Sequence, residues 1–264
     1  MALHTRDGGF VMPNAWDGLS ALMLADAGFE AIATSSAALA FTLGRLDGRH
    51  EVTREEHLEH ARLLGRLTAL PVNGDFEDGY GDTPQDVATT VEAAVASGLA
   101  GIGIEDTSGD PERPIRNFDD AVNRVRSAVN AAKGRIVVTG RTDNFIQGRP
   151  DLDDTIRRLT AFAEAGADVL YAPFPPDRDA LAAIVTAVAP TPVNVLVSPA
   201  DKVLTVPELQ KIGVKRISLG PMLYTHAMQA LQQATKALVA GDLTAATTGI
   251  GFDRISELLA RGTN

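Results

Sequence analysis

Residues 70–106 read LPVNGDFEDGYGDTPQDVATTVEAAVASGLAGIGIED and contain one complete repeat of the architecture that we predict. An apolar run at 70–72 is followed by a segment with helical patterning, and a second apolar run follows at 101–104. Gly98 stands just before that second run, where a glycine can adopt the left-handed conformation that ends a helix. Strands that alternate with helices in this way form parallel sheets.

The same unit recurs along the chain. Runs that we expect to be strands stand at 10–12, 31–33, 70–72, 101–104, 136–138, 169–171, 193–197 and 216–219. Thr53 and Glu56 form a capping box that predicts the start of one intervening helix, and Gly28 and Gly166 close two others. Eight strands alternating with helices over about 250 residues are typical of a (β/α)8 TIM barrel. We therefore predict an α/β fold in which residues 1–264 form a single TIM-barrel domain.

Two further amphipathic helices are predicted near the end of the chain, over 223–239 and 252–259. The second helix exceeds what an eightfold repeat requires, so we expect residues 242–264 to form a C-terminal helical appendage. Such a helix can pack on a partner subunit or cover the flank of its own barrel.

The composition excludes several classes of function. The 264 residues carry 24 basic and 34 acidic side chains, a formal net charge of −10, without a Lys/Arg-rich run. Nucleic acids and anionic membranes attract such runs, so we expect neither as a partner. The chain has no apolar stretch of roughly 20 residues and its first residues lack the apolar core of a secretory signal, so we expect a soluble, cytoplasmic protein. The absence of cysteine removes disulfides, thiolate metal sites and a cysteine nucleophile.

Acidic side chains follow two neighbouring predicted strands, and active sites of TIM barrels lie at the carboxyl ends of the strands. Asp75, Glu77 and Asp78 come after the third strand, and Glu105 and Asp106 come after the fourth. Carboxylates this close repel one another unless a cation or protons intervene, and oxygen-only ligands suit Mg2+. We therefore predict a Mg2+ site. The alternative, which we favour for Asp78 and Asp106, is that these acids are helix N-caps or solvated loop residues.

Two further features of this rim predict a binding site for a small carboxylate. Arg141 follows the fifth strand, where its planar guanidinium can bind a carboxylate or phosphoryl group at two points. A purely structural ion pair of Arg141 with Asp143 or Glu105 is the alternative. The turn at 34–37 offers the hydroxyls and backbone N–H groups of Ser35, Ser36 and Ala37 to a substrate carboxylate, or it is a plain helix cap.

The five histidines differ in where the predicted elements place them. His50, on the irregular stretch after the second strand, is the one that we expect to reach the site. His57 and His60 lie on the capped helix, which we place far from the rim. His4 and His226 are expected at the surface or in the core.

Asp75, Glu105 and Arg141 stand at successive strand ends, within a set of short motifs: PNAWD at 13–17, TSS at 34–36, DFEDGYG at 75–81, GIGIED at 101–106, GRTD at 140–143 and GAD at 166–168. By these motifs the chain resembles the isocitrate lyase/phosphoenolpyruvate mutase superfamily over nearly its whole length.

The resemblance implies a fold, a cofactor and residue roles. It implies that Asp75, Glu77 and Glu105 hold Mg2+ directly or through water, and that Ser35, Ser36 and Arg141 bind the substrate carboxylate. It places Asp47 on a gating loop after the second strand. The shared chemistry of the family is the stabilisation of a pyruvate-like enolate on Mg2+. Family members also imply a homotetramer, with the helix at 252–259 in the subunit contact.

Departures from the family pattern narrow the activity. Lyases of the family carry Lys-Lys-Cys-Gly-His on the loop after the fourth strand, and its cysteine is their acid/base, whereas this chain has TSGDPER at 107–113. Phosphonate-processing members carry a lysine, a histidine and a tryptophan where this chain has Thr107, Pro173 and Ala33.

We therefore expect a lyase-type enzyme that forms an enolate by C–C cleavage or decarboxylation of a small 2-oxo or 2-hydroxy carboxylate. One alternative is a phosphoenolpyruvate mutase- or phosphonopyruvate hydrolase-like enzyme that acts on a C–P bond. Another is a catalytically silent barrel that binds a carboxylate.

Without cysteine, another group must move the proton that enolate chemistry requires, and the candidates are Asp47, His50, Tyr80 and Asp106. We prefer Asp47, because closure of its loop would exclude water and raise the pKa of its carboxyl group. The alternative is that Asp47 is a solvated acid in a flexible loop at 44–49. The predicted catalytic residues are therefore Asp47, Tyr80 and Arg141.

Overall fold

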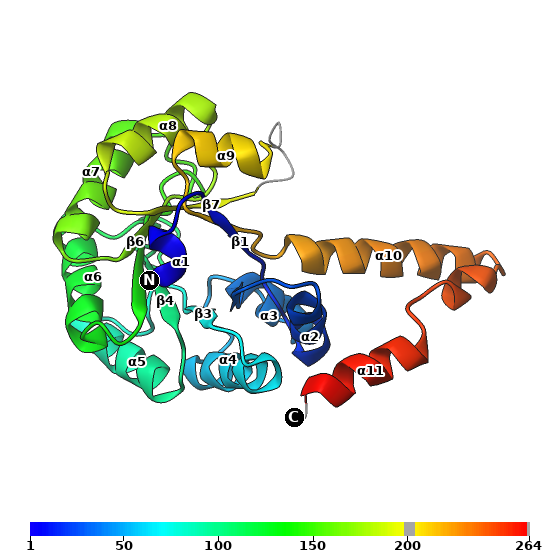
Figure 1. Cartoon of the computed structure of the whole chain (residues 1–264). Coiled ribbons are helices and arrows are strands. Elements are labelled where there is room, and N and C mark those ends of the chain that lie inside the picture. The colour runs from blue at the N-terminus through cyan, green and yellow to red at the C-terminus, as the bar shows by residue number, and fades with distance from the viewer. Residues whose placement is uncertain (198–203, 263–264) are drawn as a thin grey trace.

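The computed structural model describes residues 1–197 and 204–262, and in it eight parallel strands form one sheet (Figure 1). Hydrogen-bonded neighbours follow the order β1-β8-β7-β6-β5-β4-β3-β2. The strands are β1 Phe10–Met12, β2 Ile32–Ala33, β3 Val72–Asp75, β4 Gly101–Glu105, β5 Val137–Arg141, β6 Val169–Tyr171, β7 Val193–Leu196 and β8 Arg216–Ser218. A parallel bridge between Asn14 and Ala33 joins the β1 and β2 ends of this order. The predicted α/β barrel is confirmed.

Helices alternate with the strands and surround them. They are α1 Ala2–Thr5, α2 Gly18–Asp26, α3 Ser36–Thr42, α4 Arg54–Thr68, α5 Pro84–Ala96, α6 Phe118–Ala132, α7 Leu152–Glu164, α8 Arg178–Ala187, α9 Val206–Ile212, α10 Met222–Val239, the 3-10 turn η1 Thr244–Thr247 and α11 Phe252–Gly262. The capping box of α4 is present: the Thr53 hydroxyl accepts from the Glu56 N–H at 3.2 Å, and Glu56 accepts from the Thr53 N–H at 2.8 Å. Gly28, Gly98 and Gly166 have φ of +86°, +78° and +99°, as expected for residues that end helices.

Three strands are longer at their carboxyl ends than their apolar runs suggest. β3 extends to Asp75, β4 to Glu105 and β5 to Arg141. The pairing of β4 with β5 continues as far as the residue pair Glu105–Arg141. The polar residues that we placed after the strands are therefore the last residues of the strands. Their side chains consequently have fixed positions at the rim of the barrel.

Glycines before two of these residues let the barrel pack tightly just beneath the rim. A Cβ on Gly140 would lie 3.0 Å from Cβ of Phe162 in α7, and a Cβ on Gly74 would lie 2.3 Å from the ring of Phe76. Phe76 and Phe162 are fully buried, and each such side chain contributes roughly 1.5–3 kcal/mol of transfer free energy. A larger residue at either glycine would displace the strand end that carries Asp75 or Arg141.

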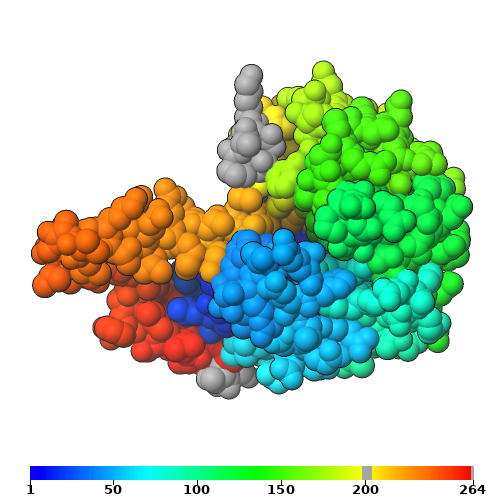
Figure 2. Space-filling view, turned by 180° about the vertical axis from the view of Figure 1, so that it is seen from behind, coloured from blue at the N-terminus to red at the C-terminus, as the bar shows by residue number. Residues whose placement is uncertain are grey.

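The C-terminal helices leave the barrel and return to it (Figure 2). α10 projects from the body and buries none of its residues. α11 lies against α2 and α4, where Leu258 is buried and Arg254 and Arg261 both pair with Asp26 of α2. Of the predicted appendage at 242–264, α11 thus lies on the flank of its own barrel, the turn η1 contacts α10, and residues 263–264 lie outside the described residues. Within 1–197 and 204–262, no helix combines the length and apolarity that crossing a membrane requires.

Candidate active site

A cavity of about 240 Å3 lies at the carboxyl ends of the strands. Six of the predicted site residues line it: Ser35, Ser36, Ala37, Asp47, Asp75 and Arg141. Glu77 and Glu105 are buried, with 5% and 8% of their surface exposed. The structure therefore brings the predicted substrate-binding residues, Asp47 and one predicted metal ligand to a single cavity.

Arg141 is surrounded by three carboxylates. Its Nε and Nη2 donate to Asp143 at 2.5 and 2.8 Å, while its Nη1 lies 3.0 Å from Glu105 and 3.8 Å from Asp75. Burial opposes the charge, but the carboxylates of Asp143 and Glu105 raise the pKa of Arg141 well above its ordinary value. The ion pairs that we considered as a structural alternative are thus present, and the same guanidinium also lines the cavity.

Asp75 is fixed by the turn that follows β2. The Ser36 N–H and hydroxyl donate to its Oδ2 at 3.0 and 3.1 Å, and its own N–H donates to the Thr34 hydroxyl at 2.8 Å. Ser35 caps α3 by accepting from the Ala38 N–H at 3.3 Å. The turn at 34–37 is therefore a helix cap and also the support of Asp75.

Burial and mutual repulsion disfavour negative charge on the carboxylates of this region. Burial, which is the largest effect, raises the pKa of Glu77 to about 7 and that of Glu105 well above its usual range. The pKa of Asp47, a residue that is exposed overall, is also raised, by desolvation of its carboxyl group and then by the charge of Asp75. A divalent cation held by Glu77 and Glu105 would reverse the shifts of these two groups, because it favours the ionised form of each ligand.

The donors available for that cation are all oxygens. Within the described part of the chain, no three Asp, Glu, His or Cys side chains form a group that could hold a metal alone. Mg2+ does not require such a group, since it usually binds one or two carboxylates and keeps several waters. Asp75 on the cavity wall, with Glu77 and Glu105 buried nearby, fits this kind of coordination.

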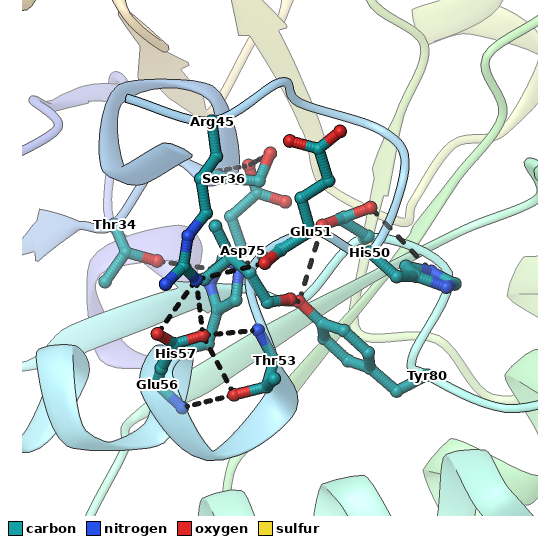
Figure 3. A network of polar contacts seen from close by, with 12 residues as sticks. Thr34, Ser36, Arg45, His50, Glu51, Thr53, Glu56, His57, Asp75 and Tyr80 are labelled. Carbon is teal, nitrogen blue, oxygen red and sulfur yellow. Dashed lines mark hydrogen bonds and ion pairs between the residues drawn. The ribbon is translucent and has the colours of Figure 1, made fainter. Parts of the chain in front are cut away.

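Residues 43–53, between α3 and α4, are the stretch that the family resemblance implies is a gating loop, and this gating stretch is anchored on α4 (Figure 3). Arg45 donates from Nη1 to both carboxylate oxygens of Glu56 at 2.8 Å and to the Glu51 carbonyl at 3.0 Å. Glu51 in turn accepts from the Leu46 N–H at 2.8 Å. These contacts hold the loop in the position that brings Asp47 to the cavity.

Two acid/base candidates, Tyr80 on the loop after β3 and His50 on the gating stretch, are not among the residues that line the cavity. The Tyr80 hydroxyl donates to the Val52 carbonyl at 2.9 Å and lies 3.4 Å from Glu77. His50 Nε2 lies 2.9 Å from Asp78 Oδ1. Both residues therefore connect the gating stretch to the segment that carries Glu77 (Figure 3).

Asp78 and Asp106 are neither helix caps nor solvated acids, so this expectation was wrong. Asp78 is buried and pairs with Arg116 at 2.8 Å and Arg124 at 3.4 Å. Asp106 accepts from the Thr142 hydroxyl and the Asp143 N–H at 2.8 and 2.9 Å, and pairs with Arg158 at 3.2 Å. Both acids therefore hold the loops behind the rim in place. These contacts already engage the carboxylate of Asp106, which was one of the acid/base candidates.

The placement of His57 far from the rim was also wrong. Its imidazole is buried, with Nε2 3.9 Å from Glu77 and its ring centroid 5.8 Å from that of Tyr80. The reason is that α4 begins directly below the gating stretch, so its first turn faces the loop after β3. His60 and His4 are buried, as the core alternative predicted, and His226 is exposed.

Several cavity residues were missed in the sequence. Asn14 accepts from the Leu219 and Gly220 N–H groups at 3.0 and 2.8 Å, which joins β1 to the end of β8. Tyr171, Asn194 and Arg216 line the cavity from β6, β7 and β8. For Asn194 and Arg216 the available signal was a charged or amide residue inside an otherwise apolar strand, since such a residue needs a polar environment in the barrel.

Comparisons with known proteins agree with this geometry. Residues 1–239 match the family model described as phosphoenolpyruvate phosphomutase. A crystal structure from Burkholderia cenocepacia J2315, named as a lyase/mutase, is 41% identical with a TM-score of 0.94, covering 98% of this chain and 93% of that chain. An uncharacterized protein of Mycobacterium tuberculosis is 34% identical over 242 residues, which is 91% of this chain and 88% of the relative. Oxaloacetate acetylhydrolase in complex with oxalate is 27% identical with a TM-score of 0.87, covering 98% and 91% of the two chains.

Other similar proteins carry the names 2-methylisocitrate lyase, oxaloacetate decarboxylase, 2,3-dimethylmalate lyase and phosphoenolpyruvate phosphomutase. These are carbon–carbon lyases and mutases of one superfamily. With a family model that spans residues 1–239 and the rim residues in place, the chain belongs to the phosphoenolpyruvate phosphomutase family and is an enzyme of the isocitrate lyase/phosphoenolpyruvate mutase superfamily.

Proposed function

We propose that this protein is a Mg2+-dependent lyase that forms a pyruvate-like enolate from a small 2-oxo or 2-hydroxy carboxylate, by C–C cleavage or decarboxylation. One observation carries the proposal: Asp75, Glu105 and Arg141 meet at the ends of three adjacent strands, beside a cavity of about 240 Å3. An all-oxygen donor set next to a guanidinium suits a metal that binds the oxygens of a small oxyanion.

Asp75, Glu77 and Glu105 would hold the Mg2+, directly or through water. When bound, Mg2+ supplies a positive charge next to the oxygen on which the enolate charge develops. Ser35, Ser36 and Ala37 would bind the substrate carboxylate together with Arg141, whose charge lies on the same cavity wall.

Asp47 is the residue that we propose moves the proton. In a decarboxylation the bond from C3 to the departing carboxylate breaks, its electron pair becomes the enolate, and a proton is then added at C3. The Asp47 carboxyl lies at the cavity, and its raised pKa favours the protonated form that such a step needs. The Tyr80 hydroxyl is already committed to the Val52 carbonyl.

The relatives support a carbon–carbon reaction on a small acid. Proteins named oxaloacetate decarboxylase are similar to this chain over 80% or more of its length. Structures named oxaloacetate acetylhydrolase cover 97% or more of it, and a protein named 2-methylisocitrate lyase covers 57%. We further propose that the chain acts as one domain, in the cytoplasm, as a homotetramer.

Reaction at a C–P bond is the second candidate, because the matching family model is described as phosphoenolpyruvate phosphomutase. Against it, Thr107 occupies the position of the lysine of phosphonate-processing members, and its hydroxyl donates to Glu105 at 2.8 Å. A short hydroxyl engaged in this way cannot replace an ammonium group that binds a phosphonate.

A substrate screen tests the proposal. The enzyme is incubated with Mg2+ and with oxaloacetate, 2-methylisocitrate, 2,3-dimethylmalate or phosphonopyruvate, and pyruvate, oxalate, CO2, phosphate and phosphoenolpyruvate are measured. Turnover of a carboxylate that chelation abolishes supports the lyase. Turnover of phosphonopyruvate alone, to phosphoenolpyruvate or to pyruvate and phosphate, supports C–P chemistry, and no turnover of any substrate supports the silent barrel.

A further inference from the structure

A second arginine, Arg216, lies deeper in the barrel than Arg141. It is the first residue of β8 and is 3% exposed, and it lines the cavity. Its Nε donates to Asn194 Oδ1 at 2.9 Å and its Nη2 donates to the Thr139 hydroxyl at 3.0 Å. Two neutral side chains from β7 and β5 thus hold the guanidinium in a fixed orientation.

The charge of Arg216 has no counter-ion in the parts of the chain that the structure describes. Its two side-chain partners there, Asn194 and Thr139, are both uncharged, in contrast to the three carboxylates around Arg141. Burial lowers the pKa of Arg216 to about 10, which still leaves the group positively charged at neutral pH. A buried cation without a partner is costly, and natural proteins accept such a cost mainly where the charge has a use.

The position of Arg216 indicates what that use is. Its Nη1 has no hydrogen-bond partner among residues 1–197 and 204–262, and the residue lines the substrate cavity. Thr139, which orients Nη2, precedes Arg141 by two residues on β5, a rise of about 7 Å. The two guanidiniums therefore lie at different depths of one cavity, one at the rim and one towards the floor.

We propose that Arg216 binds the distal carboxylate of a dianionic substrate at the floor of the cavity, while the carboxylate next to the 2-oxo or 2-hydroxy carbon lies at the rim with Arg141. The inference rests on the proposed function, because it names the substrate class of the same site. It places the distal end of the substrate down the barrel axis, away from the gating stretch. Asn194 and Thr139 are then positioning residues for the guanidinium.

Two probes matched in length test the proposal with the complete chain and Mg2+. 3,3-Difluorooxaloacetate has two carboxylates, whereas 3,3-difluoro-2-oxobutyrate has a methyl group in place of the distal one. By calorimetry, wild type should bind the diacid at least about tenfold more tightly, since a charge-assisted contact contributes about this much. Arg216→Met should abolish the preference and change binding of the monoacid by less than about twofold. Arg178→Met, which removes an exposed arginine of α8, is the matched control and should keep the preference.

Equal binding of both probes by wild type overturns the proposal without any variant, so it stays testable even if Arg216→Met fails to fold. A diacid preference that persists in folded Arg216→Met overturns it as well. Arg216→Lys, which keeps the charge but not the fork, should retain part of the preference and serves as the second variant. If Arg216→Met loses the preference for the diacid but the wild-type protein turns over no substrate, the binding role of Arg216 is supported and the lyase activity is contradicted. Turnover of a diacid with an unchanged KM in Arg216→Met supports the lyase and contradicts this role.

Discussion

Glu105 and Arg141 are register partners on the parallel strands β4 and β5, and Arg141 Nη1 lies 3.0 Å from Glu105 Oε2. The pair is held from the other side by Asp143, which accepts from Nε and Nη2 of the same guanidinium. Arg141 is therefore oriented before any ligand arrives. Its Nη1 edge is the part that faces the carboxylates of the predicted metal site.

Removal of Arg141 should destabilise the fold as well as the site. Arg141→Met leaves Asp143 and Glu105 buried without their cation, and breaking a buried ion pair costs about 3–5 kcal/mol. Urea denaturation measures this loss in the free energy of unfolding. The double variant Arg141→Met/Asp143→Asn should recover part of it, because one of the stranded charges is then absent. Arg149→Met, at a partly exposed arginine, should change stability by less than about 0.5 kcal/mol, and an equal loss there would contradict the explanation.

Asp75 should be essential for Mg2+ binding. Its carboxylate lines the cavity and is oriented by Ser36 and Thr34, so Asp75→Asn removes a positioned ligand without changing its size. Calorimetry should detect no Mg2+ binding to Asp75→Asn, and Glu105→Gln should weaken binding. Asp82→Asn is the control, because Asp82 is exposed on the loop after the same strand. Undiminished Mg2+ binding in both site variants would show that the metal site is elsewhere.

The sequence was sufficient to predict the barrel and the rim, and the reason is physical. Apolar runs alternating with capped helices leave few topologies, and in a parallel barrel the residues that end the strands must meet at one face. Asp75, Glu105 and Arg141 were found in this way. The ion pairs of Asp78 and Asp106 were not, because Arg116, Arg124 and Arg158 lie on other elements, and sequence spacing does not indicate which arginine reaches which acid.

Arg216 and His57 show a second limit of the sequence. Within a short apolar strand such as 216–219, the sequence does not indicate which side chains face the barrel interior. A buried arginine at its start therefore cannot be distinguished from an exposed arginine at the end of a strand. His57 was misplaced because the descent of the gating stretch onto α4 depends on contacts such as Arg45–Glu56. Both cases depend on tertiary contacts that periodicity does not contain.

Besides the helix at 252–259, which the family resemblance implies is in the subunit contact, self-association should involve α10. None of its residues is buried, and its exposed apolar side chains include Leu231 and Leu238, with 56% and 38% of their surface exposed. We expect light scattering to give the mass of a tetramer, and Leu231→Glu/Leu238→Glu should lower it. Gln233→Glu adds a similar charge at an exposed polar position of the same helix and should leave the mass unchanged. A monomeric wild type at micromolar concentration would contradict the prediction.

His4 should make the fold less stable in acid. Burial, followed by the charge of Arg216, lowers the pKa of His4 from 6.5 to about 3, and neither ring nitrogen has a hydrogen-bond partner within the described ranges. Below about pH 6.5 the unfolded chain therefore takes up a proton that the folded chain does not, and the free energy of unfolding falls as the pH is lowered towards 3.

The loss assigned to His4 between pH 7 and pH 5 is roughly 1–2 kcal/mol. Urea denaturation of His4→Leu at the two pH values should show a pH-dependent loss smaller than that of wild type by this amount. Thr5→Ala, on the same helix, has no titrating group and should shift both values equally. A His4→Leu protein with the pH dependence of wild type would exclude His4 as the source.

Asp47 should be the group that moves the proton. Its carboxyl lies at the cavity, whereas His50 contacts Asp78 and the Tyr80 hydroxyl donates to the Val52 carbonyl. Once a substrate is found, Asp47→Asn should lower kcat by on the order of a hundredfold or more and leave Mg2+ binding intact, since general acid–base groups contribute this much. Arg49→Gln, an exposed change in the same loop, should retain full turnover.

The pH dependence of turnover provides a second measurement of the same role. Because burial and Asp75 raise the pKa of Asp47, a proton donor there stays protonated to a higher pH than a free aspartate, and kcat should fall as the pH rises through that pKa. This falling limb should be absent from the residual activity of Asp47→Asn. Wild-type turnover in Asp47→Asn would assign the proton to His50 or Tyr80, and His50→Gln and Tyr80→Phe decide between them. Full turnover in all three variants would mean that a bound water carries the proton.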